Sequence, residues 1–205
     1  MNWSEQFRRR EEVREKYRHL WDLRIIRNRV SFSFGYLKDG ESILEIGAYH
    51  REFESKVKKE FPRILYKSMD IDPSSPHDYS SFGEIKETFD VVLLFEVIEH
   101  LPLKEGREMV AQIFKLLNPG GRVILTTPNV CTPGQFWKDA THITPYSYEE
   151  FGGLFLSQHF SILEMGRISR ESLFKFVLKR YIFLFIFRFL GIDFSQSIIL
   201  VAEKG

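Results

Sequence analysis

The chain has 205 residues, of which 43% are hydrophobic and 28% charged, the balance of a single folded domain rather than a disordered chain. Its 29 basic and 28 acidic residues leave a net charge of +1, so no overall field favours a nucleic acid as partner. The single cysteine, Cys131, excludes an internal disulfide and fits a reducing cytoplasm.

The N-terminal part, residues 4–36, is predicted to form one or two amphipathic helices. It is rich in Arg and Glu, and its apolar residues recur at near-helical spacing. The basic run at residues 8–10 lies beside acidic residues, which is typical of a solvated helix face. Because the chain begins with charge instead of an apolar stretch, no signal peptide is expected. We expect a helical cap over residues 1–38 and one domain over residues 39–205.

From residue 42 onward, apolar runs alternate with helical patterns. The run at 89–95 is continuously apolar, as in a central parallel strand buried on both faces. Residues 118–121 (Asn-Pro-Gly-Gly) end the helical pattern before them. This alternation predicts an α/β fold: a Rossmann-like, doubly wound, seven-stranded and mostly parallel sheet. The expected strands are 42–47, 64–72, 89–95, 122–127, 161–165 and 197–202, and the expected helices are 52–61, 103–117 and 148–160.

Two features after the first two strands of this domain suggest a nucleotide site. Gly47 closes the first strand ahead of a helix, where free backbone N–H groups point outward to a ligand. Asp70 ends the second strand, 23 residues after Gly47, close to the spacing of about 20 residues in nucleotide-binding βαβ units. An acid there can accept hydrogen bonds from two ribose hydroxyls. The alternative is an exposed acid in a turn, with Asp72 and Pro73 ending the strand.

Two longer motifs carry a family resemblance: FDVVLLFEVIEHL at residues 89–101 and LLNPGGRVILTTPN at residues 116–129. With this spacing the sequence resembles the class I S-adenosylmethionine-dependent methyltransferases, in particular the branch of small-molecule and quinone O-methyltransferases. The resemblance covers roughly residues 42–165 and resumes at the last strand. It implies S-adenosylmethionine as the cofactor.

The resemblance also implies roles for individual residues. The turn after the first strand holds the amino-acid end of the cofactor, the end of the second strand takes the ribose, the following loop contacts adenine, and the end of the 89–95 strand borders the sulfonium. In that order, the implied cofactor-binding residues are Glu45, Gly47, Ala48 and Tyr49; Asp70 and Ile71; Asp78; and Phe95 and Glu96.

The turn departs from the family pattern of three alternating glycines, because Tyr49 and Arg51 occupy the second and third glycine positions. One interpretation is an active enzyme whose turn is remodelled, with Arg51 or His50 pairing the cofactor's carboxylate. The other is a domain without cofactor binding that serves as a protein partner or regulatory subunit. The first is favoured because Asp70 and both longer motifs are intact. An NAD-dependent oxidoreductase fits less well, because GxGxxG is absent after the first strand.

Two histidines are candidates for chemistry. His100, with Glu96 and Glu99, resembles a cluster that holds a divalent metal in some quinone-type relatives; the favoured interpretation is that Glu99 and His100 start the next helix, so no metal is expected. His142 follows the 122–127 strand in a loop with Asp139, Thr141 and Tyr146, where the resemblance places substrate-facing residues. It is the candidate general base, with a purely structural role as the alternative.

Residues 173–190 (LFKFVLKRYIFLFIFRFL) are apolar except for four basic residues, which makes them a poor membrane span. Four interpretations stand: an interfacial helix on a bilayer, a dimerisation surface, a lid over an apolar substrate, or a helix that covers the sheet. Together these features predict a cytoplasmic enzyme, in the first case peripheral to the membrane. It would transfer a methyl group from S-adenosylmethionine to an oxygen, nitrogen or carbon of a small or lipid-like acceptor, and it would not bind nucleic acid.

Overall fold

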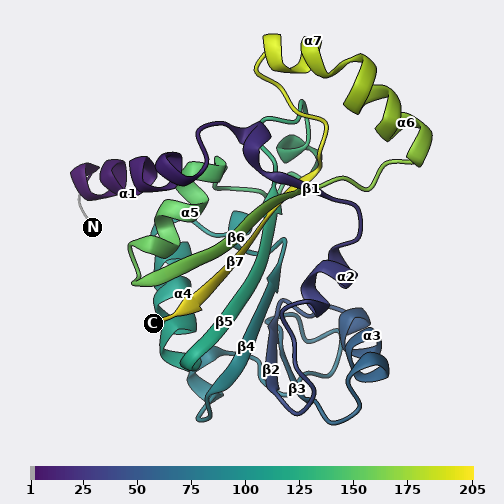
Figure 1. Ribbon diagram of the computed structural model, residues 1–205. Helices are drawn as coiled ribbons and strands as arrows, with labels where there is room; N and C mark the ends of the chain where they lie inside the picture. The colour runs from purple at the N-terminus through teal and green to yellow at the C-terminus, as the bar shows by residue number, and fades with distance from the viewer. Residues whose placement is uncertain (1–2) are drawn as a thin grey trace.

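A computed structural model describes residues 3–205 as one twisted sheet with helices on both faces (Figure 1). The strand order is β1-β6-β7-β5-β4-β2-β3, and β7 is antiparallel to both of its neighbours while the other pairs are parallel. The predicted fold class is therefore confirmed. The strands are β1 (Arg24–Ile26), β2 (Ser42–Ile46), β3 (Leu65–Met69), β4 (Phe89–Phe95), β5 (Leu117–Pro128), β6 (Phe160–Ile168) and β7 (Ser197–Lys204).

Helices α1 (Trp3–Lys16), α4 (Leu103–Leu116) and α5 (Tyr148–Leu156) cover one face of the sheet, and α2 (Arg29–Phe34) and α3 (Glu52–Glu60) cover the other (Figure 1). Each face has its own apolar core, because side chains alternate across a strand. In β4, Val92 and Leu94 join the core under α4 and α5, whereas Val91 and Leu93 join the core under α3. All four are fully buried, as their continuous apolar run predicts.

The N-terminal part differs from the expectation of helices alone. Residues 24–26 form β1, which pairs in parallel with β6 and so belongs to the main sheet. A short 3-10 turn, Leu20–Asp22, precedes it, and α2 follows with Asn28 as its N-cap, accepting the N–H of Ser31 at 3.1 Å. The predicted cap therefore includes an edge strand as well as helices.

Other boundaries shift modestly. Helix α5 ends at Leu156 and not at residue 160, and β6 continues to Ile168, beyond the predicted residue 165. The Asn-Pro-Gly-Gly breaker lies within β5, where the pairing with β4 jumps between Phe89 and Val91. Helix α4 begins at Leu103, as its periodicity predicts, but Glu99 and His100 do not start it; they lie in a separate 3-10 turn, Ile98–His100.

The apolar stretch between β6 and β7 forms α6 (Leu173–Val177), a π-helical turn (Leu178–Ile182) and α7 (Leu184–Phe189). We call residues 173–190 the helical arm. It projects from the body of the molecule beyond the sheet (Figure 1), and none of its residues is buried. Across residues 3–205, no helix has both the length and the apolarity that crossing a bilayer would require.

Candidate active site

A cavity of about 400 Å³ opens at the carboxyl ends of β2, β3 and β4. This is the edge where parallel α/β sheets bind ligands, because the loops that leave neighbouring strands meet there. Its wall combines the turn after β2, the end of β3, the loop before β4, and the 3-10 turn and helix after β4. The lining residues are Ile46, Gly47, Met69, Asp70, Ile71, Ser80, Ser81, Phe82, Glu96, Val97, His100, Leu101 and Met109.

Gly47 is required by the local geometry of the turn. Its φ is +70°, and a Cβ at this position would lie 2.3 Å from Cγ2 of Val97. Any side chain would therefore clash with the opposite wall as well as strain the backbone. The Gly47 N–H donates to the carbonyl of Met69 at 2.9 Å, which ties the turn to β3.

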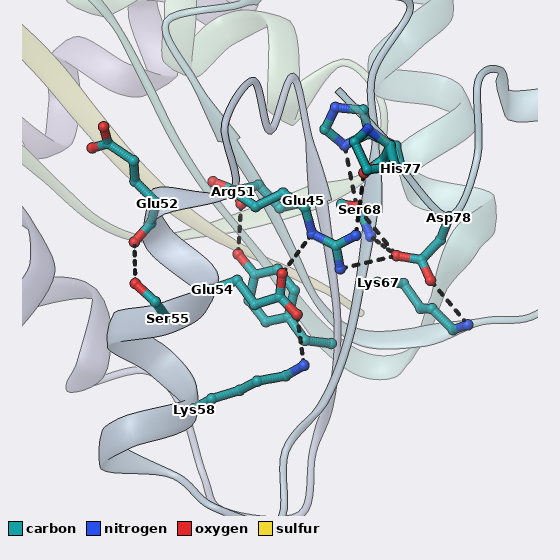
Figure 2. A network of polar contacts seen from close by, with 12 residues as sticks. Glu45, Arg51, Glu52, Glu54, Ser55, Lys58, Lys67, Ser68, His77 and Asp78 are labelled. Atoms are coloured by element: carbon teal, nitrogen blue, oxygen red, sulfur yellow. Dashed lines mark hydrogen bonds and ion pairs between the residues drawn. The ribbon is translucent and has the colours of Figure 1, made fainter. Parts of the chain in front are cut away.

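Tyr49 and Arg51 keep the backbone conformation that glycine would adopt. Their φ angles are +45° and +56°, both in the left-handed region. The Tyr49 side chain is 61% exposed. Figure 2 shows Arg51 between α3 and the loop after β3, where its guanidinium contacts Glu54 at 2.6 Å and Asp78 at 3.4 Å. Neither residue lines the cavity, so the two replacements leave it open.

Asp70 lies at the rim of the cavity with its carboxylate held by two backbone donors. Its Oδ2 accepts the N–H of Tyr49 at 2.8 Å, and its Oδ1 accepts the N–H of Asp72 at 3.0 Å. Each carboxylate oxygen retains acceptor capacity for a ligand hydroxyl. The neighbouring Ile71 is 84% exposed and lines the rim beside it.

Glu96 brings a second carboxylate to the cavity from the end of β4. Its φ is +55°, and its N–H donates to the carbonyl of Thr126 on β5 at 3.1 Å. Its Oε1 is buried and has no hydrogen-bond partner among the described residues. An unsatisfied buried acceptor of this kind is costly unless a donor reaches it, and the carboxyl of Glu99, whose pKa is raised by burial and in part by a hydrogen bond with Glu96, can donate to it when protonated.

Five of the predicted cofactor-binding residues do not line the cavity: Tyr49, described above, and four others. Ala48 is buried in the turn. Phe95 lies on the other face of the sheet, where the Arg29 guanidinium stacks 4.2 Å from its ring centre. Asp78 accepts the N–H of Ser68 at 2.9 Å and holds the loop to β3 (Figure 2). Glu45 accepts the Tyr66 hydroxyl at 2.7 Å, and burial raises the pKa of Glu45 to about 7.

The structure adds cavity residues that had not been named as candidate ligands. Ser80, Ser81 and Phe82 come from the loop before β4, and Leu101 and Met109 come from the segment after it. The Ser-Ser pair is a weak polar signal after the acids of β3. Predicting Met109 as a cavity residue would have required two things: the helical periodicity of α4, and the position of the N-terminus of α4 relative to the sheet.

A cluster of Glu99, His100 and His142 adjoins the cavity through His100. Each contributes one candidate ligand atom, and the three atoms lie within 4.8 Å of one another. The Nε2 of His142 is 4.0 Å from Oε1 of Glu99, a buried oxygen without a hydrogen-bond partner among the described residues. Burial, together with the nearby charge of Glu96, raises the pKa of Glu99.

Hydrogen bonds fix both rings so that the free nitrogens are the Nε2 atoms. Nδ1 of His142 lies 2.6 Å from the carbonyl oxygen of Phe136, which can only accept, so Nδ1 carries the proton. Thr141 donates its hydroxyl to Asp139 at 2.7 Å and therefore accepts from Nδ1 of His100 at 2.9 Å. Histidines that bind metals are held in this way, with the other ring nitrogen donating to an oxygen.

Tyr146, predicted to face the substrate, is instead a core residue. It is 2% exposed, packs among the apolar residues under α4 and α5, and has a pKa raised to about 12 by burial. The loop before it is tied to the 3-10 turn by the N–H groups of Ile143 and Thr144, which donate to the carbonyl of Glu99 at 2.8 and 3.0 Å. These bonds bring His142 beside Glu99.

Comparison with known proteins identifies the family. The chain matches the family model described as "Methyltransferase domain" over residues 13–165, about three quarters of its length. No curated protein sequence matches it.

Among solved structures, a SAM-dependent methyltransferase from Archaeoglobus fulgidus has a TM-score of 0.70 at 18% identity, over 86% of this chain and 91% of that one. The N-methyltransferase NodS from Bradyrhizobium japonicum, in complex with S-adenosyl-L-homocysteine, has a TM-score of 0.56 at 16% identity, over 86% and 82%. A structure of the complex between the Haloferax volcanii Trm112 methyltransferase activator and a methyltransferase has a TM-score of 0.62 at 13% identity, over 96% and 93%. At these identities the likenesses establish the fold.

Proposed function

The chain belongs to the methyltransferase domain family, and we propose that it binds S-adenosylmethionine in the cavity and transfers the methyl group to an oxygen, nitrogen or carbon of a small or lipid-like acceptor. One observation carries this proposal. Gly47, Asp70 and Glu96, from three separate motifs, line a single cavity of about 400 Å³ at the carboxyl edge of the sheet. A volume of this size lies within the range of small-molecule sites, roughly 300–1,000 Å³.

The lining fits the parts of the cofactor. Asp70 would accept hydrogen bonds from the ribose hydroxyls, and its two backbone donors hold it ready for that role. Apolar side chains, including Met69, Phe82 and Met109, would enclose the adenine. None of the described residues on this wall is Lys or Arg, so the carboxylates of Asp70 and Glu96 favour a cationic ligand, as a sulfonium is. NodS, which shares the fold, was solved with the demethylated form of this cofactor.

We further propose that His142 acts on the acceptor through a divalent cation shared with Glu99 and His100. The fit rests on the buried, unpaired Oε1 of Glu99 and on two Nε2 atoms left free by hydrogen bonds at the opposite ring nitrogens. Three nitrogen and oxygen ligands within 4.8 Å can surround one ion at ordinary bond lengths of about 2.0–2.2 Å. A cation there would polarise an acceptor hydroxyl and promote loss of its proton. The sequence alone favoured a site without metal.

The cofactor site is tested by isothermal titration with S-adenosylhomocysteine. We expect the unsubstituted protein to bind and Asp70→Ala to lose at least tenfold in affinity, while Asp72→Asn, an exposed neighbouring control, binds as before. Thermal unfolding of each variant separates loss of the ribose contact from loss of the fold. Absence of binding to the unsubstituted protein at millimolar ligand would exclude the enzyme and favour the alternative, a methyltransferase-fold domain that serves as a protein partner.

A further inference from the structure

The helical arm is an exposed apolar surface on an otherwise ordinary domain. Phe174, Phe185 and Phe189 are 77%, 77% and 80% exposed, and Tyr181 and Ile182 are 73% and 65% exposed. Exposed single apolar residues are common, but a continuous surface of large ones marks an interaction site. Of the four interpretations drawn from the sequence, a covering helix is excluded, because the arm projects beyond the sheet and buries none of its residues (Figure 1).

The arm and its flanking residues are also strongly basic, although the whole chain is nearly neutral. Residues 170–192 contain five basic residues and one acidic residue, a net charge of +4, whereas the whole chain carries +1. The one acid, Glu171, is paired with Lys179. Lys175, Arg180 and Arg188 form no ion pair within the described part of the chain. Arg180 lies over the ring of Tyr181, and Arg188 lies over the ring of Trp21, which precedes the sheet.

We propose that the helical arm docks onto the surface of an anionic lipid bilayer. Its aromatic and aliphatic side chains would enter the interface, and its basic residues would reach the lipid phosphates, as expected of interfacial helices with basic flanks. A second copy of the chain fits less well, because pairing two arms would bring +4 against +4 without an acidic complement. With at most six residues, or about 9 Å of rise, α6 and α7 can enter only the interfacial layer.

Docking at this place has a consequence for the cavity. Strands β5 and β6 both end beside Ser197, where β7 begins, so the arm leaves and rejoins the sheet at the same edge that carries the cavity. The Asp193 N–H donates to the carbonyl of Cys131 at 2.9 Å, which ties the base of the arm to the loop that leads to Phe136 and His142. The arm would thus hold the site at the lipid surface, where an amphiphilic acceptor resides. This consequence rests on the proposed function; the docking itself does not.

Flotation of the full chain with vesicles tests the proposal without any activity assay. We expect binding to vesicles of phosphatidylcholine with about 30% phosphatidylglycerol, whose anionic headgroups give the surface a negative potential. Phe174→Ser/Phe185→Ser/Phe189→Ser should abolish binding. Lys175→Gln/Arg180→Gln/Arg188→Gln should weaken it by about 100-fold, because each basic residue near the surface contributes to the attraction. Raising the salt should also weaken it.

Matched controls carry the same chemical changes elsewhere. Leu65→Ser alters an exposed apolar residue on the opposite edge strand, and Lys56→Gln/Lys59→Gln/Lys115→Gln removes three exposed charges outside the arm. Both should bind as the unsubstituted protein does. Absence of vesicle binding, binding that survives both arm variants, or equal binding to pure phosphatidylcholine would overturn the proposal. A concentration-dependent dimer dissolved by the Phe variant, without vesicle binding, would assign the surface to a second copy instead.

Discussion

The backbone N–H of Tyr49 donates to Oδ2 of Asp70 at 2.8 Å, so the turn after β2 and the acid after β3 form one hydrogen-bonded unit. Tyr49 has a φ of +45°, a conformation that costs a residue with a side chain about 1–2 kcal/mol. A hydrogen bond to a charged group contributes about 1.5–3 kcal/mol and can offset that cost. The left-handed backbone thus persists without glycine, and it positions the carboxylate proposed to bind ribose.

Restoring glycine at either variant position should change cofactor affinity little. In Tyr49→Gly and Arg51→Gly we expect S-adenosylhomocysteine to bind within about threefold of its original affinity, because neither side chain lines the cavity. Stability should change by no more than about 1 kcal/mol, since relief of backbone strain opposes the greater entropy of glycine in the unfolded chain. Isothermal titration measures the affinity, and thermal unfolding measures the stability. A tenfold loss in Tyr49→Gly would show that the tyrosine ring contributes to the site.

Gly47 should behave differently from the two replaced glycines. In Gly47→Ala the new methyl group would meet Val97 at 2.3 Å, so we expect a loss of about 1–3 kcal/mol in stability and at least tenfold in ligand affinity. Gly134→Ala is a matched control: its φ is also +70°, but no atom lies within 4 Å of the added carbon. If Gly47→Ala and Gly134→Ala lose the same free energy of unfolding, backbone strain alone, and not the clash with Val97, explains why position 47 requires glycine. Gly47→Ala/Val97→Ala should recover part of the loss.

The sequence predicted the positions of the strands more reliably than it predicted which face of the sheet each side chain occupies. The predicted 89–95 strand is β4 residue for residue, because an uninterrupted apolar run leaves few alternatives. Yet Glu45 and Phe95 lie on the α3 face, while the residues that follow them, Ile46 and Glu96, line the cavity. Side chains alternate with period two, so a resemblance that locates a motif still leaves the face of each residue open.

Contacts between residues far apart in the chain are the second feature that could not be predicted from the sequence. Strand β1 has three residues and depends on β6, more than 140 positions away, so its local pattern resembled a helix. Likewise His142 was singled out as a base and His100 as the start of a helix, but nothing in the sequence placed the two rings 4.7 Å apart. The loop hydrogen bonds to the carbonyl of Glu99, together with the contact between Thr141 and His100, bring them together.

Glu45 should make stability depend on pH near neutrality. Burial raises its pKa from 4.5 to about 7 in the folded protein, so the folded state binds the proton more tightly than the unfolded chain. The contribution of Glu45 to the free energy of unfolding should then be largest below about pH 4.5 and fall by about 3 kcal/mol as the pH rises to about 7. Glu45→Gln should flatten this slope and be the more stable protein at pH 8. Urea unfolding at pH 5, 6, 7 and 8 measures it, with Glu60→Gln as an exposed control. An unchanged slope in Glu45→Gln would assign the dependence to other groups.

The base of the helical arm depends on one buried ion pair. Asp193 and Arg167 are 1% and 4% exposed and meet at 2.8 Å, and Asp193 also accepts from Asn129 at 2.8 Å. Asp193→Ala would leave the guanidinium buried without its partner, which should cost about 3–5 kcal/mol of unfolding free energy. Asp39→Ala breaks the exposed pair with Arg63 and should cost much less, because solvent screens that pair. Urea unfolding compares the two, and equal losses would show that burial does not govern the difference.

Removal of metal distinguishes two roles for His142: a ligand of a divalent cation, or a general base that takes the proton itself. If Glu99, His100 and His142 hold a divalent cation, the protein should bind about one Mn²⁺, measurable by electron paramagnetic resonance, and His100→Ala and His142→Ala should each weaken that binding at least tenfold. Thr141→Val should weaken it by about 10–100-fold, because Thr141 orients His100 without touching the ion. His19→Ala, an exposed histidine outside the cluster, serves as the control. Absence of Mn²⁺ binding in the unsubstituted protein, combined with methyl transfer that withstands chelators but not His142→Ala, would instead make Nε2 of His142 the acceptor of the proton.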